Sequence, residues 1–333
     1  MIKIFKALSF TTLGFATLFS CRAYPQNQAV RVSQSPDPTR QYSLASSQNI
    51  QVGPAKIRID RTQGTLDLPT STIFDWVQNA VHSVTAYYGQ FPVSRARIVI
   101  IPVAGSQGIV QGTTWGDIDG FSGLTRIRLG ERTTQEDLAK DWAMTHELVH
   151  MAFPDLPDNQ HWLEEGLATY IEPIARAQTG QLPETQVWGD MVNGMPQGEP
   201  HEGDLGLDHT QTWARTYWGG AMFCLVADVS IRRQTGNSKG LQDALRAIVD
   251  AGGTIDKTWP LLHTLALGDQ ATGTTVLTDL YKKWSSAPAQ VDLNALWNQL
   301  GIHSKGKHIE FESTAPLAQI REAITAPKPY RSK

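Results

Sequence analysis

The hydrophobic positions in the first half of the chain follow two periods. Residues 57–60 and 125–129 alternate between apolar and polar, which predicts a strand in each place and an edge strand for the second. Residues 71–89 place apolar side chains every three or four positions, which predicts an amphipathic helix. Residues 97–101 are mostly β-branched and predict a strand buried on both faces. The Gly- and Asp-rich residues 112–123 predict a loop.

From about residue 133 the pattern becomes helical. Thr133 and Glu136 have the spacing of a capping box, which predicts a helix that runs to about Ala152, before Pro154 and Pro157. Two further long helices are predicted at 161–177 and 213–234, separated by a polar surface segment at 178–212. Shorter elements are predicted as helices at 241–249, 259–267, 275–284, 293–300 and 317–324, and as a strand at 308–311.

This order of elements, a strand-rich half followed by a helical half, predicts an α+β fold with a small mixed sheet. Residues 24–50 are rich in Gln, Ser, Pro and Arg and lack an apolar period, so we expect a disordered linker there, with structure beginning near Ile50. The main domain is expected at 51–235. Residues 236–333 are expected to form a helical region that closes a cleft.

The first 23 residues have the pattern of an export signal. Lys3 and Lys6 precede a short apolar run at 7–20, and the sequence then turns polar. This run is too short to span a bilayer, and no later segment approaches that length. Cleavage after Ala23 would release a secreted or periplasmic protein. Residues 18–21 also resemble the lipobox of bacterial lipoproteins, which would instead place a lipid anchor on Cys21 at the cell envelope.

Charge and cysteine content narrow the function classes. The chain has a formal net charge of −3 and no basic patch, so nucleic acid is not an expected partner. Of its two cysteines, Cys224 lies in an apolar helical stretch and is expected to be a buried small hydrophobe. A fold stapled by disulfides is therefore excluded.

One short motif carries the candidate chemistry. His146 and His150 flank Glu147 in the pattern H-E-x-x-H, and two histidines four residues apart on a helix lie on one face. Their ring nitrogens can converge on one metal ion, and Glu147 can reach a water beside it without binding the metal. The alternative for such a histidine pair is a hydrogen-bonded structural feature.

A catalytic zinc site needs three protein ligands and an open position. Downstream of the motif, Glu164 and Glu165 fall in the first turns of the helix predicted at 161–177. The two prolines between the helices allow the second helix to fold back on the first, which would bring one of these carboxylates to His150. The residues alone leave both glutamates open.

Together the motifs resemble those of a known family. H-E-L-V-H at 146–150, followed by W-L-E-E-G-L-A-T-Y at 162–170, is similar to the gluzincin zinc metallopeptidases. In their membrane-alanyl-aminopeptidase branch the second motif is W-L-N-E-G-F-A. Aligning the E-G pair implies that Glu165 is the third ligand, with Glu164 where Asn is usual. The resemblance covers about residues 95–250 and implies a zincin-like catalytic domain, one Zn²⁺ ion and a peptide or protein substrate.

A third segment extends the resemblance. Tyr217 begins a Y-W-G-G-A stretch similar to the Tyr-x-x-Gly-Ala stretch of the same branch, in which the tyrosine hydrogen-bonds the developing oxyanion. The family's G-x-M-E-N sequence, whose Glu captures the substrate's free amine, has no counterpart between Gly112 and Leu129. Exopeptidase specificity is thus unsupported.

These observations predict an exported zinc-dependent metallohydrolase, a peptidase, with ligands His146, His150 and Glu165. Glu147 would be the general base and Tyr217 the oxyanion donor. The sequence leaves two alternatives open. One is a zinc hydrolase of a non-peptide amide or ester, and the other is a non-catalytic binding protein on a zincin scaffold.

Overall fold

The computed structural model describes residues 37–306 and 308–327. The predicted signal, the alternative lipid anchor at Cys21 and the first part of the predicted linker lie outside the described residues. The chain from Thr39 onward forms one compact unit. The predicted α+β class is confirmed, because this unit combines one mixed sheet with many helices.

The larger sheet has five strands in the order β1-β2-β3-β5-β4. The outer pairs β1/β2 and β4/β5 are antiparallel, whereas β2/β3 and β3/β5 are parallel. Its strands are β1 (Leu44–Val52), β2 (Ala55–Thr62), β3 (Arg95–Val103), β4 (Ile109–Ile118) and β5 (Phe121–Gly130). A separate hairpin joins β6 (Ile302–Lys305) to β7 (His308–Phe311).

Strand β1 corrects the predicted disordered linker at 24–50. Residues Leu44–Val52 form this strand, and a two-residue turn at Gly53 and Pro54 joins it to β2. Its side chains alternate between half-buried and exposed, with none fully buried. An edge strand of this kind is held by backbone hydrogen bonds to β2 and needs little apolar content, which is why composition alone suggested disorder.

Strand β4 corrects two further predictions. Residues 112–118 of the predicted loop at 112–123 belong to the edge strand β4, and β5 lies inside the sheet between β3 and β4. Asp119 and Gly120 both have positive φ and close the β4–β5 turn as in a type I′ hairpin. Gly112 and Gly116 resembled loop residues, but each sits where another part of the chain leaves no space for a Cβ atom.

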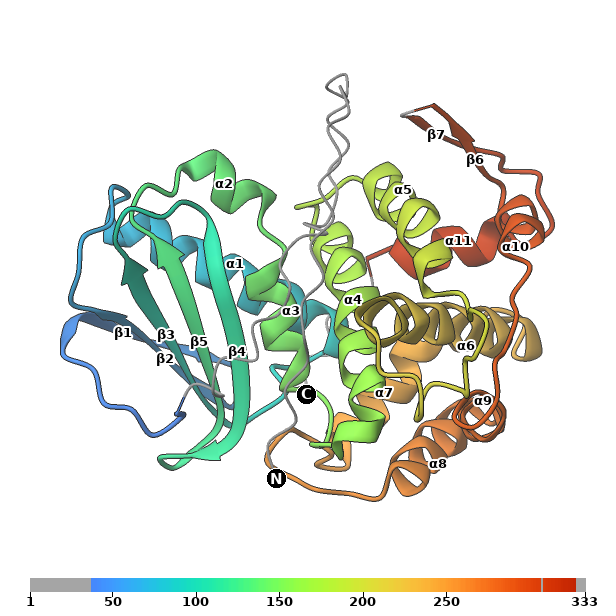
Figure 1. The fold of residues 1–333 in the computed structure, drawn as a ribbon, viewed down its shortest axis with the longest axis horizontal. Helices are drawn as coiled ribbons and strands as arrows, with labels where there is room; N and C mark the ends of the chain where they lie inside the picture. Colours follow the sequence, from blue (N-terminus) through green and yellow to red (C-terminus); the bar gives the residue numbers. More distant parts are fainter. Residues whose placement is uncertain (1–36, 307, 328–333) are drawn as a thin grey trace. The chain divides into compact units, whose positions relative to one another are not determined.

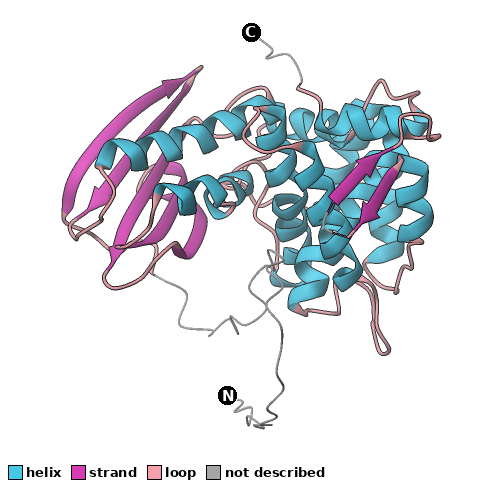
Figure 2. Ribbon diagram, turned by 90° about the horizontal axis from the view of Figure 1, so that it is seen from above, coloured by secondary structure: helices cyan, strands magenta, loops and turns pink. Residues whose placement is uncertain are grey.

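The helices lie together on one side of the sheet, as Figure 2 shows. Figure 1 places α3 between β4 and α4, whereas α2 lies near the top of the sheet. The α-helices are α1 (Thr70–Tyr88), α2 (Gln135–Lys140), α3 (Ala143–His150), α4 (His161–Gln178), α5 (Glu184–Gly194), α6 (Gly220–Gln234), α7 (Leu241–Asp250), α8 (Leu261–Thr272), α9 (Val276–Trp284), α10 (Leu293–Leu300) and α11 (Ala318–Thr325).

The helix predicted from Thr133 to about Ala152 is broken into α2 and α3. The cap is Thr134 rather than Thr133, and it forms its capping box with Asp137 rather than Glu136. Asp141 is extended and ends α2, and its carboxylate accepts hydrogen bonds from the backbone N–H groups of Ala143 and Met144. Because Asp141 caps a new helix, α3 begins with its own N-terminus one turn before His146.

The prediction of a polar surface segment at 178–212 is wrong in part. This segment contains α5 and a 3₁₀ turn at Met195–Gly198, and its apolar side chains are buried. These buried side chains are Val187, Trp188, Met191 and Met195. Their spacing was helical, but the flanking glycines and prolines obscured it. The described residues contain no helix that is both long and apolar enough to span a membrane.

Candidate metal centre

Helices α3 and α4 pack side by side and bring three side chains together. Nε2 of His146 lies 3.0 Å from Oε2 of Glu165, and Nε2 of His150 lies 3.8 Å from the same oxygen. All three donor atoms are within 4.8 Å of one another. The side chains of His146 and Glu165 are buried, and that of His150 is nearly so.

The chain turns back between these helices through a short proline-containing loop. A 3₁₀ turn follows Pro157 and leads directly into α4, so Glu165 lies one turn inside α4. The next residue, Gly166, meets the backbone of Gly220 at the start of α6, where a Cβ atom would be only 2.4 Å away. The E-G pair therefore has a packing reason, since only glycine lets α6 cross α4 beside Glu165.

The neighbouring Glu164 points elsewhere. Its Oε1 accepts a hydrogen bond from the backbone N–H of Leu156 at 3.2 Å, and its Oε2 is paired with Nδ1 of His161 at 2.9 Å. Glu164 therefore stabilises the loop before α4. Of the two glutamates, only Glu165 lies beside the two histidines of the motif.

Electrostatics keep the Glu165 carboxylate charged. Burial by itself raises the pKa of Glu165, but the nearby His150, His146 and His161 together hold that pKa well below its usual range. Burial lowers the pKa of His150 to about 4, so its ring is neutral at neutral pH and keeps a lone pair for a metal. Among the described residues, the ion-pair partners of Glu165 are all histidines.

Glu147 faces strand β4. Its Oε2 accepts a hydrogen bond from the Thr114 hydroxyl at 2.8 Å, and its Oε1 lies against Gly112, where a Cβ atom would come within 2.6 Å. Burial raises the pKa of Glu147 to about 7. A carboxylate with a pKa near neutrality can both accept and release a proton under physiological conditions.

Tyr217 covers the cluster from a third element. It lies in a π-helical turn, Arg215–Gly219, that leads into α6. Its ring stacks on His146 with centroids 6.1 Å apart and an interplanar angle of 14°. Burial raises the pKa of Tyr217, so the hydroxyl stays protonated and remains a donor. Single-turn π-helical segments are frequent at functional sites.

A buried ion pair holds this turn in place. Nε of Arg215 lies 2.7 Å from Oδ2 of Asp204, and both side chains are almost fully buried. Arg215 also donates a hydrogen bond to the backbone carbonyl of Gly198. The π turn is therefore anchored to the segment that precedes it.

Two residues that contact the site have no place in the sequence motifs. Thr114 was hidden because residues 112–123 resembled a loop. His161 precedes the E-G motif, and its Nε2 lies 3.1 Å from Oε1 of Glu165. The spacing of His161 and Glu165, one helical turn apart, was the signal that could have found this contact. The hydrogen bonds with Glu164 and Glu165 raise the pKa of His161 to about 10, so the ring donates from both nitrogens.

The donor set fits zinc. Two imidazole nitrogens and one carboxylate oxygen are ligands that zinc takes in catalytic sites. In a tetrahedral site with bonds of about 2.0–2.1 Å, neighbouring donor atoms lie about 3.3 Å apart. The distances of 3.0 Å and 3.8 Å from Oε2 of Glu165 to the two histidine nitrogens bracket that value.

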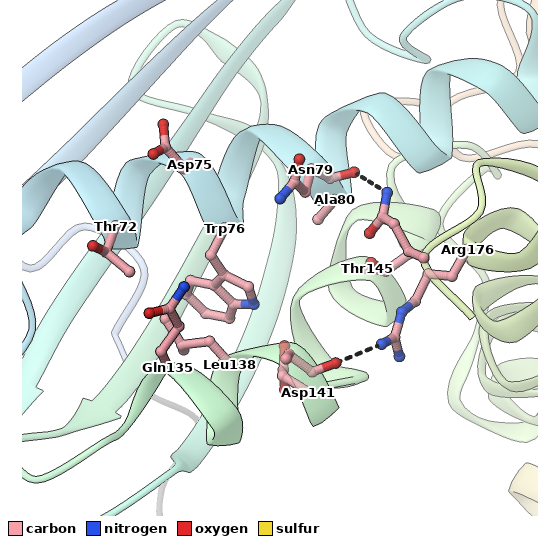
Figure 3. Close-up of a pocket in the computed structure, with 12 residues that line it drawn as sticks. Thr72, Asp75, Trp76, Asn79, Ala80, Gln135, Leu138, Asp141, Thr145 and Arg176 are labelled. Atoms are coloured by element: carbon pink, nitrogen blue, oxygen red, sulfur yellow. Dashed lines mark hydrogen bonds between the residues drawn. The ribbon is translucent and has the colours of Figure 1, made fainter. Parts of the chain in front are cut away.

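A cavity of about 350 Å³ lies beyond the N-terminus of α3, away from these donors (Figure 3). Trp76 of α1, Asp141 and Arg176 of α4 line it, together with Thr145, which directly precedes His146. Burial raises the pKa of Asp141. The cavity contains none of the converging donors, so the candidate chemistry does not take place there.

Comparisons with known proteins support the fold. No family model matches the chain, and no curated protein does. Among solved structures it is similar to an aminopeptidase N family protein from Idiomarina loihiensis, with a TM-score of 0.55 and 14% identity, over 77% of this chain and 49% of that one. It is also similar to an M1 zinc metallopeptidase from Deinococcus radiodurans, with a TM-score of 0.47 and 19% identity, over 76% of this chain and 53% of that one.

The chain thus spans about half the length of these two proteins. At such low identity, the likeness to the Idiomarina protein shows a shared fold and nothing about activity. The function has to be argued from the residues of this chain.

Proposed function

We propose that this protein is a zinc-dependent hydrolase of amide bonds, and specifically a peptidase, in which His146, His150 and Glu165 hold one zinc ion. The observation that carries the proposal is the convergence of these three side chains at the contact of α3 and α4. Among the described residues no Lys or Arg pairs with this cluster, and His161 holds only the outer oxygen of Glu165, so Oε2 is left for a cation from solution.

The bound metal would act as a Lewis acid and lower the pKa of a water molecule in its open position to about 7. Glu147 accepts the proton of the attacking water and delivers it to the leaving amine. Thr114 holds one oxygen of Glu147, which leaves the other oxygen for this transfer. Tyr217 donates a hydrogen bond from its hydroxyl to the oxyanion that develops on the substrate carbonyl.

Strand β4 is the element best placed to hold an extended substrate. We had expected residues 125–129 to be the edge, but β4 is the edge strand and it also contacts Glu147 through Thr114. Its free backbone groups can pair with an extended peptide by β-augmentation. Strand β4 contains no glutamate, so it offers no counterpart of the aminopeptidases' amine-capturing residue.

The surrounding assignments complete the proposal. We propose residues 51–235 as the catalytic domain, with β1 added at its start, and residues 236–333 as a helical region that closes the cleft. We also propose export, with a signal at 1–23 and either secretion or lipid attachment at Cys21.

The test is Glu147→Gln. The amide cannot accept the water's proton, so turnover of an unstructured protein substrate should fall by about 10²–10⁴-fold. The zinc content, measured by elemental analysis, should stay at one ion per chain, because Glu147 is not a ligand. His146→Ala is the matched variant that should lose the metal. Near-normal turnover in Glu147→Gln would exclude Glu147 as the base.

Two other outcomes would change the function class. Zinc binding with hydrolysis of esters but not of peptides would identify a non-peptide hydrolase. Zinc binding with no hydrolysis of either would identify a binding protein on this scaffold. A wild-type chain that binds no zinc would refute the proposal as a whole.

A further inference from the structure

We propose that His161 is a positioning residue that locks Glu165 into binding zinc through one oxygen only. The inference rests on the proposed zinc site. The observation behind it is that the two oxygens of Glu165 have different partners. Oε2 faces His146 and His150, whereas Oε1 is held by Nε2 of His161 at 3.1 Å.

His161 is itself fixed at its other nitrogen. Nδ1 of His161 lies 2.9 Å from Oε2 of Glu164, and the second oxygen of Glu164 accepts the backbone N–H of Leu156. A chain of polar contacts therefore runs from the backbone of the loop before α4, through hydrogen bonds at Glu164, to the ion pair of His161 with the outer oxygen of Glu165. Glu164 lies three residues and Glu165 four residues after His161, so both carboxylates can reach its ring across the first turn of α4.

The lock has a chemical consequence. A free carboxylate can turn both oxygens to a metal and fill two coordination positions. With Oε1 held by an N–H donor, Glu165 presents one oxygen, and the ion keeps an open position for water or substrate. Hydrogen-bonding partners of metal ligands also fix the ligand's orientation, and their loss typically costs about 10–100-fold in metal affinity.

The position of His161 argues against a direct ligand role. It is not part of the group whose donor atoms converge, and its side chain is half exposed at the first residue of α4. A histidine with this exposure can be replaced without opening the core. The variants below should therefore fold.

The experiment separates shape from hydrogen bonding. His161→Phe keeps the ring but removes both donors, whereas His161→Gln keeps one donor within reach of Glu165. His303→Phe is the matched control, because His303 is a half-exposed histidine paired with Glu312 at 3.0 Å on the separate hairpin. Zinc affinity is measured by chelator competition. The coordination number is followed by visible absorption with Co²⁺ in place of zinc, since four-coordinate Co²⁺ absorbs more strongly than five-coordinate Co²⁺.

We expect His161→Phe to bind zinc about 10–100-fold more weakly and to show a weaker Co²⁺ absorption. His161→Gln should recover most of the affinity, and His303→Phe should match the wild type. Wild-type affinity and spectrum in His161→Phe would overturn the proposal. A loss as complete as that in Glu165→Gln would also overturn it, because it would make His161 a direct ligand.

The same titrations distinguish this proposal from the proposed function. A wild-type chain that binds neither Zn²⁺ nor Co²⁺ would refute both. A wild-type chain that binds zinc tightly, with no difference among the three variants, would refute only the role of His161. Melting temperatures of the metal-free variants, expected to stay close to that of the wild type, show that any loss of affinity is not a loss of fold.

Discussion

Two buried carboxylates on neighbouring helices have opposite surroundings. Asp228 on α6 is paired with Nε of Arg232 at 2.7 Å and accepts hydrogen bonds from the Tyr170 hydroxyl and the Leu241 backbone N–H. Glu165 on α4 is also buried, but its ion-pair partners within the described residues are histidine rings.

The difference shows which of the two carboxylates has its charge neutralised by an arginine of the protein itself. Arg232 is charged at every physiological pH and also bonds Asn237 and the carbonyl of Ala323, so it neutralises Asp228 and ties α6 to the C-terminal segment. The His161 ring pairs only with the outer oxygen of Glu165, so Oε2 faces the rings of His146 and His150 with no arginine or lysine beside it. We infer that Asp228 serves stability, whereas the Glu165 cluster is completed by a metal.

The largest effect on stability is expected from a substitution of Asp228. Asp228→Asn should lower the free energy of unfolding by about 3–5 kcal/mol, because Arg232 would be left as an unpaired buried charge. Urea unfolding of the metal-free protein measures this loss. Zinc stoichiometry of the folded variant should stay unchanged, and a stability close to that of the wild type would refute the assignment of this pair.

Glu165→Gln is the counterpart, with the opposite pattern expected. The metal-free variant should unfold at nearly the wild-type denaturant concentration, because the half-exposed His161 is solvated by water when it loses this partner. The wild type should gain about 4 kcal/mol when free zinc is 1,000-fold above its dissociation constant, and this gain should vanish in the variant. Equal losses in Asp228→Asn and Glu165→Gln without metal would erase the distinction between the two clusters.

A single hydroxyl gives the next largest effect. Tyr217→Phe removes one oxyanion donor, which should lower kcat by about 10²–10³-fold, or about 2.7–4 kcal/mol, with little change in KM. Steady-state kinetics measure this split. Zinc occupancy and thermal stability should hardly change, because the ring still stacks on His146. If kcat stays intact while the melting temperature falls, Tyr217 is a packing residue.

The smallest effect concerns a third carboxylate, Asp60 in β2, which like Asp228 is paired with arginine. Burial alone raises its pKa, but hydrogen bonds from Ser47, Arg58 and Arg97 bring the pKa below 3.8. A folded pKa below the unfolded value gives stability that is present above pH 3.8 and is lost as the pH falls through the folded pKa.

Asp60→Asn should therefore be less stable than the wild type at neutral pH by about 1.5–3 kcal/mol. The two proteins should converge as the pH drops below about 4, which chemical unfolding across a pH series would measure. The loss should be smaller than at Asp228, because Arg58 is partly exposed and water can solvate it. A difference that does not depend on pH would exclude the ionised carboxylate as its cause.

The sequence by itself determined the features that local geometry controls. The helices at α1 and α4 were predicted within one or two residues, because their apolar period repeats along a single stretch of chain. The pairing of His146 and His150 follows from their spacing on one helix. The break at Asp141 was missed, since a capping aspartate inside a helical pattern has the same local appearance as an exposed helical residue.

Only the tertiary structure decided which distant segments meet. Gly112 and Gly116 in β4 suggested a loop. Glycine is required there because Glu147 and Ile255 pack against these positions, and both residues are distant in the sequence. The choice of Glu165 over Glu164 likewise depended on which face of α4 packs against α3. Helix and strand patterns depend on residues a few positions apart. The close approach of two backbone segments, and the contacts of a buried carboxylate with several elements, depend instead on how whole elements pack.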